Sequence, residues 1–383
     1  TSGGRTVWAA GALRDSNEAD GGGRERKNMT AHRIAVIGGD GIGPEVVESA
    51  IPVLERAAAK HGFGCAWERL PYGADHYLAT GETLPEPAFR HLRDDVDAIF
   101  VGALGDPRVP GNEHARDILL GLRFRLDLYI NFRPVTLLHP DLTPLKADGG
   151  GPGRTGADEG GRRIDFVIFR ENTEGLYLGR TRTEGDAQIA EEVNTPRGVE
   201  RIIRAAFDWA RAHGRSLVTM SDKSNAVPAH HLWQRLFRDV AAEFVGIEAE
   251  HRYIDALAME LVRRPERFQV IVANNLFGDI LSDLGAALVG GLGIAASATL
   301  PRGRAGLFEP VHGSAPRHAG RGDANPVATI LTGALMFEHL GHPAAARDLE
   351  RAVRETIAAG IRAPDIGGRA TTTGVAEAVI SRL

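Results

Sequence analysis

The segment from residue 267 to residue 283 constrains the fold of this 383-residue chain more than any other. Its first part, 267–274 (RFQVIVAN), is a short apolar, β-branched run typical of a buried strand. Its second part favours a helix in which Asp279 and Asp283, four residues apart, lie on one face. Because α/β proteins keep their chemistry where a strand ends and a helix begins, the segment predicts an α/β fold with an acidic site at this junction.

The acidic pair admits two interpretations. Two adjacent carboxylates repel each other unless a cation lies between them, and a hard divalent ion bound by both would relieve that repulsion. Alternatively, Asp279 and Asp283 form a solvated acidic face that binds no metal. The pair taken alone favours the solvated face, but other features of the chain reverse that preference.

The rest of the chain alternates strand and helix patterns without an internal repeat, which also indicates an α/β architecture. We expect strands at 33–37, 96–102, 129–135, 164–170, 217–221 and 248–254. We expect helices at 44–60, 117–128, 199–213 and 255–263. The glycine-rich stretch 146–163 predicts a mobile loop, and residues 1–28 predict a disordered leader or an expression tag.

Bulk composition excludes several classes of protein. A net charge of −5 gives no electrostatic reason to expect a nucleic-acid partner or an anionic membrane surface. The single cysteine, Cys65, rules out a disulfide framework and a cysteine-based zinc cluster, and it fits a reducing compartment. No apolar run approaches the roughly 20 residues that span a bilayer. We therefore expect a cytoplasmic protein.

The turn 38–43 (GGDGIG) is only partly similar to a dinucleotide-binding fingerprint. It lacks the spacing of the glycines in GxGxxG, and no acidic residue ends a second strand about 20 residues later. We therefore expect a fold that is not a Rossmann fold, with any cofactor site elsewhere in the chain.

Cationic residues near the ends of strands and helices suggest a site for an anionic substrate. Arg123, Arg133 and Arg170 could together clamp carboxylates, because guanidinium groups bind them bidentately, although each taken alone favours a structural role. Tyr177 follows Arg170 by seven residues, and Lys223 stands just after the strand 217–221. A lysine held near a metal ion and arginines can act as a base.

Seven motifs carry a family resemblance. In chain order they are GGDGIGPEV, NFRP, FRENTEGLY, SDKSN, YIDALAMELV, NNLFGDILSD and FEPVHGSAP. From residue 33 to its C-terminus the chain resembles the β-decarboxylating dehydrogenases, which act on isopropylmalate, isocitrate, homoisocitrate, tartrate or D-malate. The run LLGLRFRLDLYINFRP looks most like isopropylmalate dehydrogenases. The resemblance implies two subdomains sharing a large central sheet: 29–128 plus 290–383 on the cofactor side, and 129–289 for dimerisation and metal binding.

The resemblance also implies roles for individual residues. Arg123, Arg133 and Arg170 would hold the substrate carboxylates, and Tyr177 would protonate the enol after CO₂ departs. Asp279 and Asp283, with the partner subunit's Asp255, would bind Mg²⁺ or Mn²⁺. Lys223 would reach across a homodimer with shared active sites and act as the base. Cofactor contacts would come from Asn225, Glu309, His312, Gly313, Ser314, Ala315 and Asn325.

The chain departs from its relatives after the HGSAP motif. NAD-dependent members carry there an aspartate that binds the ribose hydroxyls, whereas this chain has Arg317 and His318. A guanidinium attracts a 2′-phosphate and a carboxylate repels it, so we expect NADP to be preferred over NAD. The alternative is that Arg317 faces solvent and NAD binds through the remaining contacts.

The substrate is the least determined feature. Leu119 and Leu120 would form an apolar wall suited to an isopropyl group, while Arg116 could bind a further anionic group. D-malate and tartrate enzymes share the leucine pair and the KSN triplet at Lys223. We expect a (2R)-hydroxy-3-carboxy acid such as 3-isopropylmalate, with tartrate, D-malate, isocitrate, homoisocitrate or an unusual 2-hydroxy diacid as alternatives. A non-catalytic regulatory subunit is a further alternative, but such subunits lose the lysine, the tyrosine or a metal aspartate.

Overall fold

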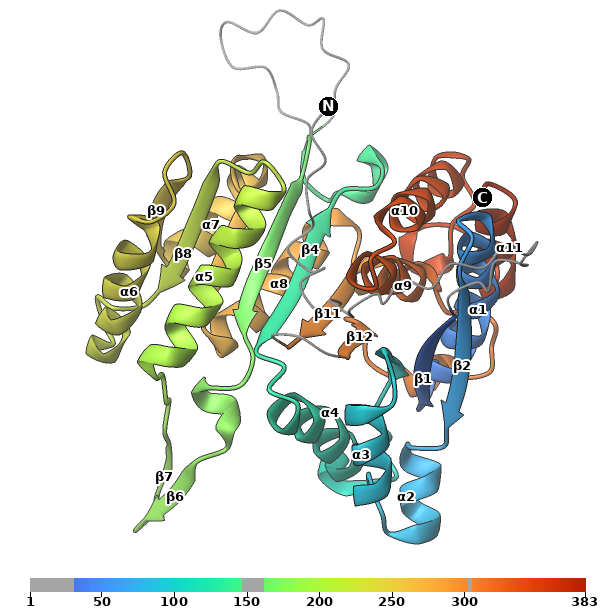
Figure 1. The fold of residues 1–383 in the computed structure, drawn as a ribbon, viewed down its shortest axis with the longest axis horizontal. Helices are drawn as coiled ribbons and strands as arrows, with labels where there is room; N and C mark the ends of the chain where they lie inside the picture. The colour runs from blue at the N-terminus through green and yellow to red at the C-terminus, as the bar shows by residue number, and fades with distance from the viewer. Residues whose placement is uncertain (1–30, 147–161, 302–304) are drawn as a thin grey trace, which may run out of the picture.

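The computed structural model describes residues 31–146, 162–301 and 305–383 (Figure 1). Its main feature is a ten-stranded sheet in the order β2-β1-β3-β12-β11-β4-β5-β10-β8-β9. The strands are β1 (Ala31–Gly39), β2 (Gly64–Leu70), β3 (Ala98–Ala103), β4 (Ile130–Thr136), β5 (Asp165–Glu171), β8 (Leu217–Asp222), β9 (Glu248–Tyr253), β10 (Val270–Ala273), β11 (Ala296–Leu300) and β12 (Gly306–Pro310). A separate antiparallel hairpin consists of β6 (Thr181–Glu184) and β7 (Ala187–Ala190).

Helices lie on both sides of this sheet, with α5 in front of its left half in Figure 1 and α8 behind. The helices are α1 (Gly43–Lys60), α2 (Ala74–Thr80), α3 (Glu86–Asp94), α4 (Glu113–Arg125), α5 (Pro196–Ala212), α6 (His231–Ala241), α7 (Ile254–Arg263), α8 (Asn275–Val289), α9 (Val327–His339), α10 (Pro343–Ala358) and α11 (Thr372–Ile380). Within the described residues, no helix combines the length and apolar character that crossing a membrane requires.

Two parallel blocks of strands meet at an antiparallel centre. On one side β1 runs parallel to β2 and β3, and β3 to β12. On the other side β10 runs parallel to β5 and β8, and β8 to β9. Between the blocks, β4 pairs antiparallel with both β5 and β11, and β11 with β12. The sheet is therefore continuous through both predicted subdomains, whose boundaries stay a prediction.

The predicted strands and helices are confirmed, with shifted ends that have local causes. Helix α5 begins at Pro196 rather than at residue 199, because the Thr195 hydroxyl accepts a hydrogen bond of 3.1 Å from the Gly198 amide and caps the helix. Strand β10 starts only at Val270, since residues 265–267 form a 3₁₀ turn. The loop predicted at 146–163 falls almost entirely outside the described residues, as does the leader predicted at 1–28.

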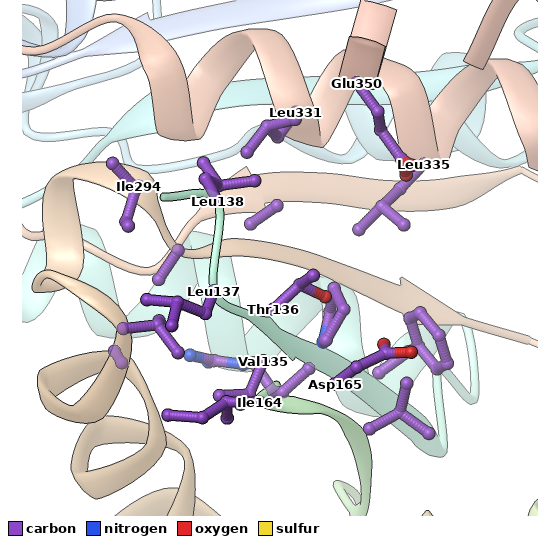
Figure 2. A pocket seen from close by; sticks show the side chains of 18 of the residues that line it. Val135, Thr136, Leu137, Leu138, Ile164, Asp165, Ile294, Leu331, Leu335 and Glu350 are labelled. Atoms are coloured by element: carbon purple, nitrogen blue, oxygen red, sulfur yellow. The ribbon is translucent and has the colours of Figure 1, made fainter. Parts of the chain in front are cut away.

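A cavity of about 930 Å³ lies beside the central strands (Figure 2). Val135 and Leu137 line it from the end of β4, while Leu331, Leu335 and Glu350 face it from α9 and α10. Of the residues predicted for the site, only Arg133 is among the described residues that line this cavity. The cavity is therefore distinct from the acidic site on α8.

Candidate active site

Helix α8 presents the acidic pair immediately after β10. The Asn274 side chain caps the helix by accepting a hydrogen bond of 2.9 Å from the Phe277 amide, so Asp279 and Asp283 lie in the first turns. Gly278 brings the helix close to Arg170, because a Cβ at position 278 would lie 2.6 Å from the Arg170 Cβ. The absence of a side chain at 278 thus allows α8 to pack directly on β5.

Asp279 contacts two other residues that are predicted for the site. One of its oxygens forms an ion pair with Arg170 Nη1, and the other accepts a hydrogen bond of 2.6 Å from the Tyr177 hydroxyl. The Arg170 guanidinium also donates to the Asn275 side-chain oxygen, at 2.9 Å from Nε and 2.7 Å from Nη2. Arg170, Tyr177 and Asp279 therefore form one hydrogen-bonded cluster.

The other two arginines lie within electrostatic reach of this cluster. Arg123 donates to Glu309 at 2.7 Å, and Arg133 donates to the Asn131 side chain at 2.6 Å. Arg170, Arg133 and Arg123 are only 2%, 7% and 9% exposed. Burial lowers the pKa of Arg133, and burial also lowers the pKa of Arg170 to about 10. Three buried guanidinium groups thus lie close enough to repel one another, and Asp279 and Glu309 each pair with one of them.

The carboxylates of this cluster repel one another as well. Partial desolvation raises the pKa of Asp283, and the negative charge of Asp279 raises it further, whereas Arg133 and Arg170 lower it. A divalent cation between the two carboxylates would relieve this repulsion, so the pair fits a metal ion. Within the described residues, however, no three His, Cys, Asp or Glu side chains are grouped so as to hold one.

Lys223 and Asp255 pair with each other instead of joining the arginine cluster. Lys223 follows β8, Asp255 stands in the first turn of α7, and Lys223 Nζ lies 2.8 Å from Asp255 Oδ2. This hydrogen bond from Lys223 lowers the pKa of Asp255, which is two-thirds exposed. In the part of the chain that the structure describes, no hydrogen bond or ion pair joins either residue to Asp279, Asp283 or the three arginines. A single chain thus carries two separate groups of predicted site residues.

The glycine-rich turn after β1 packs on the predicted cofactor loop. The Ile42 amide donates to the Ser314 carbonyl at 2.8 Å. Gly41 has a φ of +57°, and a Cβ there would lie 2.0 Å from that same carbonyl oxygen, so only glycine allows the approach. The turn therefore supports the segment from His312 to Ala315 through its backbone.

Two buried polar groups lie near this loop. His312 is largely enclosed, burial lowers its pKa, and none of the described residues offers a hydrogen-bond partner to its Nε2. Asn325 donates to both oxygens of Asp365 at 3.1 Å and accepts a hydrogen bond of 3.1 Å from the Val327 amide at the start of α9. The sequence analysis missed Asp365, because it stands in an unremarkable turn 40 residues away from its partner.

Arg317 and His318 have different environments. His318 Nδ1 lies 3.2 Å from an oxygen of Asp323, a residue that the sequence analysis also missed. Arg317 is exposed and has no ion-pair partner among the described residues. The one carboxylate that contacts this motif is therefore engaged by His318, and the Arg317 guanidinium is available to a ligand.

The residues expected to select the substrate lie on different faces of α4. Arg116 is exposed, and its ion pair is with Asp117 at 3.7 Å. Leu119 packs against the hydrophobic core, whereas Leu120 is half-buried and outside that core. Asn225, expected to contact the nicotinamide, is exposed beside Lys223. The apolar wall expected from Leu119 and Leu120 stays a prediction.

Comparison with known proteins agrees with these observations. A family model for isocitrate/isopropylmalate dehydrogenase matches residues 33–379. A 3-isopropylmalate dehydrogenase from Thermobifida fusca is 43% identical over 348 residues, covering 89% of this chain and 94% of the relative. The chain belongs to the isocitrate/isopropylmalate dehydrogenase family. A probable tartrate dehydrogenase/decarboxylase from Bacillus subtilis is 40% identical over 364 residues, covering 93% of this chain and 99% of that protein.

The fold and the class of protein follow from this membership. The crystal structure of isocitrate dehydrogenase from Methylococcus capsulatus matches with a TM-score of 0.78 at 39% identity, covering 92% of this chain and 99% of the other. The predicted α/β fold with a large shared sheet, distinct from a Rossmann fold, is confirmed. The protein is an oxidoreductase of a family whose dehydrogenases use a metal ion and NAD(P).

Proposed function

We propose that this dehydrogenase oxidises and decarboxylates a (2R)-2-hydroxy-3-carboxy acid such as 3-isopropylmalate. The observation that carries the proposal is the buried group of Arg123, Arg133 and Arg170 beside Asp279 and Tyr177. Three cations can neutralise the two carboxylates of a malate unit, and planar guanidinium groups bind carboxylates in a defined orientation. Enclosure of these groups makes their attraction for an anion stronger than it would be in water.

The reaction balances with NAD(P) as the oxidant. Lys223, in its neutral amine form, would take the C2 hydroxyl proton, and a bound NAD(P) would accept the hydride that leaves C2, so that C2 becomes a ketone. The C3 carboxylate then leaves as CO₂, and its bonding electrons form an enolate that Tyr177 protonates at C3. A divalent cation, held by Asp279 and Asp283 when bound, would stabilise the negative charge on the C2 oxygen.

Tyr177 is suited to the last proton transfer. Burial raises the pKa of Tyr177, and the hydrogen bond to Asp279 raises it further. The phenol therefore stays protonated at neutral pH, which a general acid requires. The same hydrogen bond fixes the position of the hydroxyl next to the arginine cluster.

We further propose a homodimer in which each site receives Lys223 and Asp255 from the partner subunit. Three apolar side chains support it: Met259 and Val262 on α7 and Ile280 on α8 are 54%, 44% and 55% exposed. Helices α7 and α8 pack together, so a second copy could cover these side chains at once. The β6–β7 hairpin also projects from the body beside the α8 half of the molecule (Figure 1). A partner on this face would meet the exposed Asp255, on α7 itself.

The cofactors follow from the same residues. The oxygen ligands of Asp279 and Asp283 suit Mg²⁺ or Mn²⁺. We propose NADP over NAD because no described carboxylate pairs with the exposed Arg317 guanidinium, which could therefore bind a 2′-phosphate. Asn225, Glu309, His312, Gly313, Ser314, Ala315 and Asn325 would contact the dinucleotide, with His312 Nε2 as a buried atom that has no described partner.

The alternative substrates lack the apolar group at C3. The similarity to a probable tartrate dehydrogenase/decarboxylase from Bacillus subtilis supports tartrate as the second candidate. Isocitrate and homoisocitrate require a further cation near C3, and Arg116 faces away from the buried side of α4.

A substrate panel tests the proposal. The protein would be assayed with 3-isopropylmalate, D-malate, tartrate, isocitrate and homoisocitrate, each with NAD and NADP and with Mg²⁺ or Mn²⁺. We expect the highest kcat/KM with 3-isopropylmalate and NADP, and no activity for Asp279→Asn with any substrate. Full turnover by Asp279→Asn would show that the metal site is misplaced, and a higher kcat/KM with tartrate would select the second candidate.

A further inference from the structure

We propose that Glu192 and His230 are positioning residues for the reaction, because together they hold the Lys223 loop and the start of α8 in a fixed relation. The inference rests on the proposed function, in which Lys223 is the base and α8 carries the metal ligands. Neither Glu192 nor His230 contacts the arginine cluster through any hydrogen bond or ion pair among the described residues. Their effect on the reaction must therefore pass through the groups that they hold.

His230 fixes the backbone at the base. Its Nδ1 accepts a hydrogen bond of 3.1 Å from the Lys223 amide, so the ring proton must be on Nε2. That nitrogen faces both oxygens of Glu192, each at 3.1 Å. Because the His230 ring is only 1% exposed, its orientation and tautomer are held from both ends. The Glu192 carboxylate thus fixes the backbone position of Lys223 through His230.

Glu192 reaches α8 through the residue that begins this helix. Its Oε1 accepts a hydrogen bond of 2.8 Å from the Asn274 side-chain amide, whose oxygen caps the Phe277 amide. The Phe277 ring, in turn, lies edge-on to the His230 ring with centroids 5.7 Å apart. The Glu192 carboxylate therefore connects the backbone at Lys223 with the start of α8 through the side chains of His230 and Asn274.

The position of Glu192 in the chain also brings it close to the turn that carries Tyr177. It stands two residues after β7, at the point where the projecting hairpin returns to the body. The next residue, Val193, accepts a hydrogen bond of 2.8 Å from the Gly175 amide, in the 3₁₀ turn that carries Tyr177. In the proposed dimer, Lys223 serves the partner's site and α8 serves its own. The Glu192 network would then connect groups that belong to two different active sites.

The principal test replaces Glu192 with glutamine. We expect Glu192→Gln to lower kcat at saturating metal and substrate by about 10- to 100-fold, the range for loss of a residue that orients a ligand or base. KM for NAD(P), the dimer mass and the melting temperature should change little. The matched control is Glu191→Gln, at the adjacent carboxylate, which pairs with Arg182 inside the hairpin. Its kcat should stay within about twofold of wild type.

Two variants of His230 separate the halves of the network. His230→Gln keeps a donor toward Glu192 but loses the acceptor for the Lys223 amide, and His230→Asn does the reverse. Both should lower kcat, and combining His230→Asn with Glu192→Gln should cost less than the sum of the two effects, since both act on the same hydrogen bond, which His230→Asn removes and Glu192→Gln weakens. If Glu192→Gln does not fold, the two His230 variants decide the question.

The outcomes distinguish this inference from the proposed function. Suppose that Lys223→Ala is inactive, but Glu192→Gln and both His230 variants keep the wild-type kcat per folded dimer and show only a lower melting temperature. That result would overturn the positioning role. Activity retained by Lys223→Ala would instead overturn the proposed function. A fall in kcat with unchanged KM for NAD(P), in variants that remain dimeric, supports the inference.

Discussion

The Lys223 ammonium lies 2.8 Å from the Asp255 carboxylate of the same chain. Both residues are predicted to act in the active site, yet they are held apart from the Arg170–Asp279 ion pair. In the proposed shared active site, one subunit supplies Lys223 and Asp255 together to the site of its partner. The pairing therefore gives a direct way to test the dimer.

Two inactive variants should complement each other. Lys223→Ala and Asp279→Asn each remove a function, but a mixed dimer retains one site with both residues. Random reassociation of equal amounts should restore about a quarter of wild-type activity, because half of the dimers are mixed and each has one intact site. The control is Lys223→Ala mixed with Asp255→Asn, which should restore none, because both residues are supplied to the same site. Recovery in the control, or none in the test pair, would contradict the shared arrangement.

The Tyr177 hydroxyl should be needed for the final proton transfer. Tyr177→Phe removes the proton donor and the 2.6 Å hydrogen bond to Asp279. We expect kcat for the overall reaction to fall by about 10²- to 10⁴-fold. Binding of substrate, measured by calorimetry, should weaken far less, because the three arginines remain. Wild-type kcat in Tyr177→Phe would exclude the tyrosine as the acid.

Arg317 should select the cofactor. Arg317→Asp places a negative charge where a 2′-phosphate would bind, so the ratio of kcat/KM for NADP to that for NAD should fall by about 10- to 100-fold. Arg321→Asp makes the same change of charge at an exposed residue four positions further on. An equal loss in Arg321→Asp would mean that the charge of the loop, and not Arg317, determines the preference.

Glu171 should make stability depend on pH. Burial raises the pKa of Glu171 to about 7, against an ordinary value of 4.5, although amides of Thr173 and Glu174 donate to its carboxylate. The folded state therefore binds its proton more tightly than the unfolded chain does. This contribution is complete below pH 4.5 and is lost as the pH rises to 7, by up to roughly 3 kcal/mol in the free energy of unfolding.

Chemical denaturation across pH 4.5 to 8 measures this effect. Glu171→Gln cannot titrate, so its free energy of unfolding should vary less over this interval than that of wild type. Equal slopes in the two proteins would assign the pH dependence to other groups.

Gly278 should tolerate no side chain. In Gly278→Ala the new methyl group would meet the Arg170 Cβ at 2.6 Å, and either α8 or Arg170 would have to move. We expect a loss of about 1–3 kcal/mol in stability and a lower kcat. Gly121→Ala in α4 is the contrasting change, since nothing lies within 4 Å of a Cβ there. It should stabilise the protein by up to about 1 kcal/mol, as alanine favours a helix.

Several of the elements that the sequence analysis missed lack a clear apolar period. Helix α9 is buried along most of its length, so its sequence lacks the alternating faces that identify a surface helix. Strand β6 has the opposite property, because every residue in it is exposed and its sequence, TRTE, shows no apolar alternation. The five-residue strands β11 and β12 were missed as well.

The candidate active site was likewise predictable only in part. The sequence by itself determined the α/β pattern and the local geometry of α8, because Asp279 and Asp283 are one helical turn apart whatever surrounds them. Of the three arginines that it identified, Arg123 and Arg170 stand near the ends of α4 and β5, whereas Arg133 lies in the middle of β4. Only the tertiary structure decided which groups meet: Arg123 pairs with Glu309 across 186 positions, and Arg170 with Asp279 across 109. It also separated Lys223 and Asp255 from both, because contacts between distant segments depend on how the sheet is ordered, which no local pattern encodes.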